Sequence, residues 1–150
     1  MSNATKTLYK ELETQKMGSQ TSLTQALDQL VFNDAGLIPA IAQQHDSGEV
    51  LMMAWMNRAA IEETLQTKQV CYWSRSRNNY WRKGESSGNQ QKLVSMSTDC
   101  DGDTLLLKVE QLGAACHTGR RDCFYNDINE QGLTISSDPI QDPSQLYGKH

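Results

Sequence analysis

The sequence predicts an α+β fold in which a mainly antiparallel sheet is accompanied by a few short helices. Two observations support this prediction. Apolar runs separated by turn-forming residues predict consecutive strands, and two capping residues stand directly before short segments with helical periodicity. The chain has 150 residues, of which 37% are hydrophobic, so we expect one compact domain with a real core.

The first helix is expected to begin after Ser22. Ser22 and Gln25 form an S-x-x-Q capping box, and apolar residues follow at helical spacing, namely Leu23, Ala26, Leu27, Leu30 and Val31. Asn57 can cap a second helix that continues to about Thr67. The first is a short amphipathic helix, and the second is short and expected to pack on the sheet.

Strands are predicted between and after these helices. The runs LIPAIAQQ and EVLMMAWM are joined by HDSG, in which Asp, Ser and Gly favour a hairpin turn. VCYWSRS alternates as a further strand, and YWRKGESSGN is expected to be a loop rich in glycine and serine. KLVSMST and TLLLKVEQ are two more strands, on either side of DCDGD.

Three regions are expected along the chain. Residues 1–20 are polar and are predicted to be a disordered arm or residues added by cloning. The folded domain is expected to span residues 21–125. Residues 126–150 contain two prolines and little apolar periodicity, so they are predicted to form an irregular C-terminal tail.

Composition limits the partners. The formal net charge of −4 argues against a nucleic-acid backbone as the main partner, because such binding rewards a strongly basic face. No apolar run approaches the length of a membrane span, and residues 1–20 lack the apolar segment of a secretory signal. We therefore expect a cytoplasmic protein, in which four unevenly spaced cysteines are better explained as metal ligands or buried thiols than as disulfides.

Asp99, Asp101 and Asp103 alternate along a short segment. In an extended strand their carboxylates would leave one face while Cys100 points to the other. If Asp101-Gly102 is instead the corner of a hairpin, the carboxylates still cluster near the bend. Either geometry offers oxygen ligands suited to Mg²⁺, and the alternative is that the acids only solvate a turn.

Cys100, Cys116 and Cys123 offer three thiolates, a soft ligand set that favours zinc. Three protein ligands would leave a position open for water, which suggests catalysis. A closed structural site would need a fourth ligand, for which His117 and Cys71 are the candidates. Cys71 lies in an apolar strand and is better explained as a small core residue.

His117 directly follows a proposed zinc ligand, so it is the candidate proton shuttle, although a histidine there can also serve only as a hydrogen-bonding partner. The stretch from Tyr72 to Asn89 is a candidate substrate site. Its arginine and lysine side chains can bind phosphate, its aromatic rings can stack a base, and its serines offer hydroxyl donors. The candidates are Arg75, Arg77, Lys83 and Ser86; a solvated basic loop and single-stranded nucleic-acid binding are the alternatives.

Taken together, six motifs resemble the phosphoribosyl-AMP cyclohydrolase family: GLIPAI, EVLMMAWMN, YWSRSR, WRKGESSGN, DCDGDTLLLKVEQ and ACHTGRRDCF. The likeness covers roughly residues 30–125 in unbroken order. It implies hydrolytic opening of the adenine ring of 1-(5-phosphoribosyl)-AMP between N1 and C6, the third step of histidine biosynthesis. It also implies that Zn²⁺ and Mg²⁺ are required, in an interlocked homodimer with sites at the subunit interface.

The resemblance assigns roles to individual residues. Asp99, Asp101 and Asp103 match the family's Mg²⁺ carboxylates, and Cys100, Cys116 and Cys123 match its zinc thiolates, with Cys100 reaching zinc together with cysteines of the partner subunit. Two positions depart from the pattern: Asn89 stands where some relatives carry histidine, and Asp122 where serine often precedes the last cysteine. Two hypotheses from other classes stay open, a structural-zinc interaction module and an RNA-binding domain.

Overall fold

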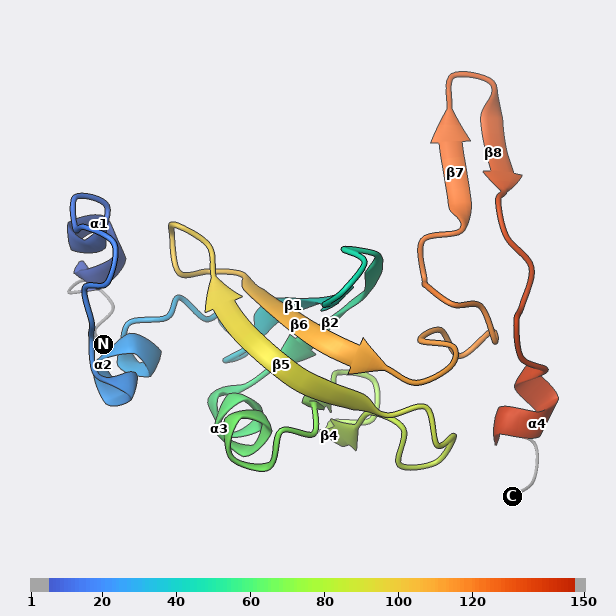
Figure 1. Cartoon of the computed structure of the whole chain (residues 1–150), viewed down its shortest axis with the longest axis horizontal. Helices are drawn as coiled ribbons and strands as arrows, with labels where there is room; N and C mark the ends of the chain where they lie inside the picture. The colour runs from blue at the N-terminus through green and yellow to red at the C-terminus, as the bar shows by residue number, and fades with distance from the viewer. Residues whose placement is uncertain (1–5, 148–150) are drawn as a thin grey trace.

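The computed structural model describes residues 6–147 and has two sheets (Figure 1). The main sheet has six strands in the order β4-β3-β2-β1-β6-β5, and the second is the hairpin β7-β8. In chain order the elements are α1 (Leu8–Leu12), α2 (Leu23–Asp28), β1 (Ile38–Gln44), β2 (Val50–Met56), α3 (Arg58–Thr67), β3 (Cys71–Ser74), β4 (Asn79–Arg82), β5 (Gln91–Thr98), β6 (Leu105–Gln111), β7 (Asn126–Asn129), β8 (Gly132–Ile135) and α4 (Pro143–Tyr147).

Both predicted helix caps are confirmed. The Ser22 side chain accepts a hydrogen bond from the Gln25 backbone N–H at the start of α2, and Asn57 Oδ1 accepts one from Ala60 N–H at the start of α3, at 2.8 Å. Each bond satisfies a backbone donor that the first turn of a helix otherwise leaves free. The predicted hairpin is confirmed as well, because β1 and β2 pair antiparallel across the 45–49 turn.

The expectation of a mainly antiparallel sheet needs one correction. Within residues 6–147, four of the five neighbouring pairs of the main sheet are antiparallel, but β1 and β6 pair in parallel, with Ala40 opposite Leu105 and Gln44 opposite Val109. The sheet is therefore mixed. An alternating apolar pattern marks a strand and its buried face but does not encode the direction of its neighbour.

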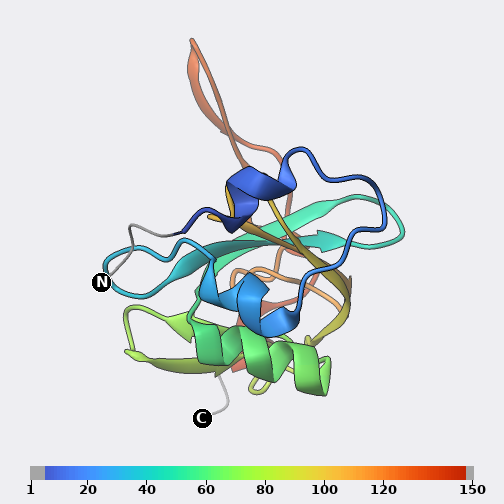
Figure 2. The ribbon, with the colours of Figure 1, turned by 90° about the vertical axis from the view of Figure 1, so that its left-hand side faces the viewer.

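The core lies between the main sheet and helices α2 and α3, which lie beside each other on one face (Figure 2). Alternate residues of β1 and β6 point into it, so that Ile38, Ala40, Leu107 and Val109 are fully buried. An ion pair between Arg58 and Asp28 joins the two helices. No helix among residues 6–147 is both long and apolar enough to cross a membrane.

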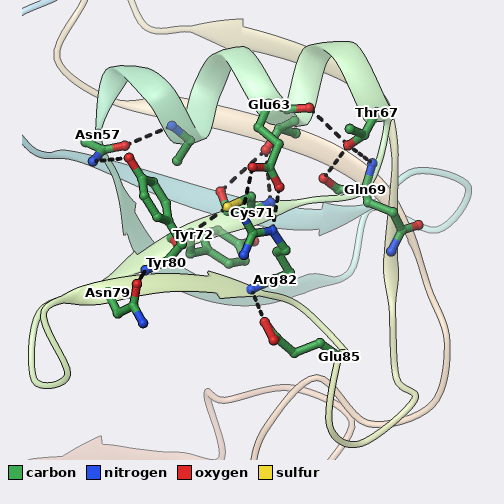
Figure 3. A network of polar contacts seen from close by, with 12 residues as sticks. Asn57, Glu63, Thr67, Gln69, Cys71, Tyr72, Asn79, Tyr80, Arg82 and Glu85 are labelled. Carbon is green, nitrogen blue, oxygen red and sulfur yellow. Dashed lines mark hydrogen bonds and ion pairs between the residues drawn. The ribbon is translucent and has the colours of Figure 1, made fainter.

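A polar network fastens α3 to the edge of the sheet (Figure 3). The Arg82 guanidinium donates to both carboxylate oxygens of Glu63, at 2.7 and 3.0 Å, and Asn57 Nδ2 donates to the Tyr80 hydroxyl. Tyr80 and Arg82 belong to β4, which occupies part of the stretch expected to be a loop. The loop expectation is therefore wrong for residues 80–82, where pairing with β3 overrides the polar composition.

The two ends of the described chain carry more structure than their composition suggests. Within the expected N-terminal arm, α1 forms a helical turn whose Tyr9 packs against the core and donates to the Ala26 carbonyl. Within the expected irregular tail, β7 and β8 form a hairpin that projects from the body (Figure 1). Its turn is fixed by Asn129, whose side chain accepts from Gln131 N–H, and by Gly132 at a φ of 132°.

Candidate functional site

The predicted Mg²⁺ carboxylates lie together in the turn between β5 and β6. Ligand oxygens of Asp99, Asp101 and Asp103 all lie within 4.8 Å of one another, and the three side chains are exposed. The hairpin-corner geometry is the one adopted, because Asp99 and Thr104 pair across the turn and Gly102 has a φ of 71°. The turn is thus a compact cluster of hard oxygen donors.

The charges of this turn act on each other. A hydrogen bond with Asp99, followed by burial and the Asp99 charge, raises the pKa of Asp103. Burial acts to raise the pKa of Asp99 as well, but hydrogen bonds from Asp103 and nearby backbone groups outweigh it and leave that pKa lowered. The Asp101 carboxylate raises the pKa of the Cys100 thiol beside it. A bound cation would relieve this repulsion, which supports the fit of the cluster to Mg²⁺.

Residue packing around the turn identifies a contributor that the sequence did not reveal. The ring of Tyr9 covers Gly102 so closely that a Cβ there would lie 2.5 Å from it, and the Gly102 carbonyl accepts from Val31 N–H. Tyr9 of α1 and Val31, which follows α2, therefore support the acidic turn. A lone tyrosine in a polar N-terminal stretch carries no pattern that would predict this contact.

Cys116 and Cys123 lie close together in the loop that follows β6, residues 112–125, which we call the thiol loop. Cys116 is buried, Cys123 is half-buried, and the Cys123 backbone N–H donates to the Leu51 carbonyl of β2. Burial raises the pKa of the Cys123 thiol to about 12, and the charge of a Cys116 thiolate adds to this. A second thiolate beside the first is costly without a cation, so the pair fits a soft divalent metal such as zinc.

Lys83 reaches this thiol pair from the loop after β4. Its side chain is buried, its ammonium donates to the Ala115 carbonyl, and it lies 5.2 Å from the centre of the Trp81 ring. Burial lowers the pKa of Lys83, while the thiolates of Cys123 and Cys116 act in the opposite direction. A substrate role was predicted for Lys83 from sequence, and in the structure its ammonium bonds the thiol loop at Ala115.

A pocket of about 580 Å³ lies beside the thiol loop. Its lining includes Arg77, Lys83, Ser86 and His117, which are four of the residues predicted from sequence to bind substrate or move protons. Arg75 is not among them, because its guanidinium lies 4.9 Å from the centre of the Trp55 ring in a different depression. One pocket therefore contains both the proton-shuttle candidate and candidates for phosphate binding.

The third predicted thiolate lies elsewhere. Cys100 is exposed in the β5–β6 turn, whereas the Cys116–Cys123 loop follows the opposite end of β6 (Figure 1). Seven residues of β6 alone span roughly 20 Å. Among residues 6–147 the three thiols do not form one close group within a chain; besides the aspartates, the group of metal-binding type there is His45, Asp46 and Glu110.

Cys71, one of the two candidates for a fourth zinc ligand, is a residue of the hydrophobic core. It is fully buried in β3, and burial raises the pKa of its thiol to about 11, with the Glu63 charge acting in the same direction. Its backbone N–H donates to Thr64 Oγ1 of α3 at 2.9 Å. The interpretation of Cys71 as a core residue is confirmed.

Comparison with known proteins adds the decisive observation. The family model for phosphoribosyl-AMP cyclohydrolase matches residues 52–125, which include the aspartates, the thiol loop and the pocket. The chain is 65% identical to the phosphoribosyl-AMP cyclohydrolase of Alcanivorax borkumensis over 95% of this chain and 100% of that protein. The chain belongs to the phosphoribosyl-AMP cyclohydrolase family.

Further relatives agree. Phosphoribosyl-AMP cyclohydrolases of Chromohalobacter salexigens and Alkalilimnicola ehrlichii are 62% and 60% identical, over 94% and 93% of this chain and 97% and 99% of those proteins. The resemblance seen in the motifs is confirmed, and so is the prediction of an enzyme. Membership in the phosphoribosyl-AMP cyclohydrolase family also disfavours the structural-zinc module and the RNA-binding domain as main functions.

Proposed function

We propose that this enzyme hydrolyses the N1–C6 bond of the adenine ring of 1-(5-phosphoribosyl)-AMP. The observation that carries the proposal is the pocket that contains His117, beside the Cys116–Cys123 pair, together with Arg77 and Ser86. Alkylation at N1 makes the purine electron-poor at C6. The oxygen of water is added at C6, which becomes the carboxamide carbon, and N1 takes up a proton as its bond to C6 breaks.

The thiol loop is the proposed zinc site. Cys116 and Cys123 supply two soft donors from one chain, and the Thr118 hydroxyl donates to Cys116 Sγ at 3.1 Å, which fixes the direction of that sulfur. When bound, zinc supplies Lewis acidity that makes water a stronger nucleophile near neutral pH. Lys83 offsets part of the negative charge of the two thiolates.

The aspartate turn is the proposed magnesium site, through Asp99, Asp101 and Asp103. When bound, magnesium supplies positive charge that orients the negative groups of the substrate. The exposed position of the turn suits this role, since the cation would keep several waters and remain open to a phosphate.

The remaining roles belong to side chains of the pocket. His117 is exposed on the pocket wall next to Cys116 and is proposed to carry a proton between water and the purine. Arg77 and Ser86 are proposed to bind one phosphate, the first through a charged fork and the second through its hydroxyl. Arg75 was an equal candidate from sequence, and its position over Trp55 makes it the weaker one.

A homodimer is proposed because one chain does not bring all the thiols together. Cys100 of the partner subunit would join Cys116 and Cys123, so that each site is shared. The β7–β8 hairpin supports this arrangement. Its apolar side chains are exposed, at 79% for Ile128 and 58% for Leu133, and an isolated two-stranded hairpin is marginal in water. A concavity of about 610 Å³ between Cys123 and β7 leaves space for a partner.

Incubation of the purified enzyme with 1-(5-phosphoribosyl)-AMP tests the reaction. Ring opening changes the ultraviolet absorbance of the purine, and the rate should vanish on chelation and return only when Zn²⁺ and Mg²⁺ are both restored. Stoichiometric zinc binding with no change in absorbance would instead indicate a purely structural metal.

A further inference from the structure

The segment between β8 and α4 contacts the thiol loop at Ala114, where Gln141 of this segment and Asn89 together hold the backbone. Gln141 Oε1 accepts from the Ala114 backbone N–H at 2.8 Å. Asn89 Nδ2 donates to the carbonyl of the same residue, Ala114, at 3.1 Å, and to Gln141 Oε1 at 2.8 Å. Asn89 is only 7% exposed, so this three-membered clasp is largely shielded from water.

Gln141 also holds the other end of the loop, at Gly119. The backbone N–H groups of Ile140 and Gln141 both donate to the Gly119 carbonyl, at 2.8 and 3.1 Å. Gly119 has a φ of 86°, and a Cβ there would lie 2.0 Å from the Gln141 carbonyl oxygen. Gln141 therefore contacts the loop at Ala114 through its side chain and at Gly119 through its backbone.

Cys116 and His117 lie between these two contacts. Residues 113–119 belong to no helix or strand, so their position depends on individual hydrogen bonds. The loop's other anchors are the Lys83 bond to Ala115, the Arg121 bond to Gly113 and two backbone bonds to 120–121. The Gln141 clasp is the part of this support that comes from beyond residue 125, outside the segment that the family model matches.

We propose that Gln141 is a positioning residue, which holds the 113–119 loop so that Cys116 and the pocket-lining His117 keep a fixed geometry. It acts through its carbonyl oxygen, with Asn89 as the second half of the clasp. The effect on catalysis rests on the proposed function, whereas the effect on the loop does not. A shift of about 1 Å in a catalytic group can lower a rate by orders of magnitude, which is why a clasp remote from the substrate matters.

The chemistry of the clasp allows a sharp set of variants. Gln141→Met keeps the length of the side chain and removes the acceptor, whereas Gln141→Glu keeps an oxygen acceptor at the same position. Gln145→Met changes an exposed glutamine of α4 in the same way and is the matched control. Asn89→Asp replaces the donor of the clasp by an acceptor and reaches the same loop from the other side.

Hydrogen exchange in the full-length protein reads the loop directly. In Gln141→Met, exchange at the Ala114 amide should speed up about tenfold relative to wild type, as expected for loss of a shielded hydrogen bond, while β1 and β6 amides keep their protection. Gln141→Glu and Gln145→Met should exchange as wild type does. Exchange at the Ala114 amide should speed up in Asn89→Asp as it does in Gln141→Met. If Gln141→Met does not fold, the Asn89→Asp variant tests the clasp in its place.

The second measurement is the steady-state kinetics of the same variants with 1-(5-phosphoribosyl)-AMP. The value of kcat should fall about tenfold in Gln141→Met with KM nearly unchanged, and Gln141→Glu should restore it to within about twofold. Wild-type exchange at Ala114 in both Gln141→Met and Asn89→Asp, or equal loss of kcat in the Met and Glu variants, would overturn the proposal. If neither the wild type nor any variant turns over the substrate, the proposed function is wrong. The exchange data still show whether Gln141 holds the loop.

Discussion

The two ends of the β5–β6 hairpin carry donors of opposite character, built in opposite ways. The three aspartates of the turn are exposed; hydrogen bonds within residues 99–104 shape the turn, with added support from Tyr9 and Val31 at Gly102. The thiol loop is partly buried, and it depends on Lys83, Asn89 and Gln141 from distant parts of the chain. A cluster of hard ligands can form on a local turn, whereas buried thiols need surrounding structure to offset their charge.

The largest effect is expected at the thiol end. Cys116→Ser or Cys123→Ser replaces a soft ligand by a hydroxyl, so zinc should be lost and activity should fall by about 10³-fold or more. Metal analysis and kcat/KM measure both losses. Cys71→Ser, at a buried thiol outside the loop, is the control: it should lower stability and leave zinc bound. A zinc-free Cys116→Ser enzyme of wild-type activity would refute the assignment.

Zinc binding should also depend on pH at this end. The raised pKa of Cys123 keeps its thiol protonated well above neutrality in the metal-free protein, and zinc must displace that proton. Zinc affinity should therefore rise with pH by about tenfold per unit for each thiol that loses a proton. Competition for zinc between the protein and a chelator, measured from about pH 6 to about pH 8, gives the slope of zinc affinity against pH. A flat profile would mean that the thiols are not ligands.

A smaller effect is expected at the acidic end. Asp101→Asn removes one anionic ligand at nearly constant volume, so activity should fall by about tenfold or more, with partial rescue by excess Mg²⁺. Zinc content should stay near the wild-type level, because the substitution leaves all three proposed zinc thiols, Cys100, Cys116 and Cys123, in place. Asp34→Asn, in the exposed turn before β1, is the control. An unchanged Mg²⁺ dependence in Asp101→Asn would count against the turn.

The smallest expected effect is a difference in KM between variants of Arg75 and Arg77, two arginines that were equal candidates from sequence. Arg77→Ala should raise KM by about tenfold, because it removes a charged donor from the pocket wall. Arg75→Ala should change KM by less than about twofold, since its guanidinium rests on Trp55 in another depression. Similar KM values in the two variants would show that the pocket is not the phosphate site.

The contrast between local and distant contacts also explains how much the sequence could predict. Caps such as Ser22 and Asn57, and the turn at 45–49, are short-range signals, and each predicted its element correctly. The aspartate cluster was predictable for the same reason. The parallel pairing of β1 with β6 was not, because it joins segments that are far apart in the chain and alternation gives no direction.

The site residues divide in the same way. Arg77, Ser86 and His117 were predicted from residue type and line one pocket, and their roles stay predictions; Arg75 shares their pattern and lies elsewhere. Gln141 and Asn89 could not be found, since single amides in polar segments carry no periodicity or motif. The β7–β8 hairpin was missed because its short strands lie in a stretch with prolines and little periodicity.

The central claim is that each zinc site is shared between two subunits. Subunit exchange between inactive Cys100→Ser and inactive Cys116→Ser chains tests it most directly. In a shared site, one site of each heterodimer keeps all three thiolates and the other loses two, so an equal mixture should recover about a quarter of wild-type activity. Activity that stays at the level of the separate variants after verified exchange, or a fully active monomer, would contradict the shared site.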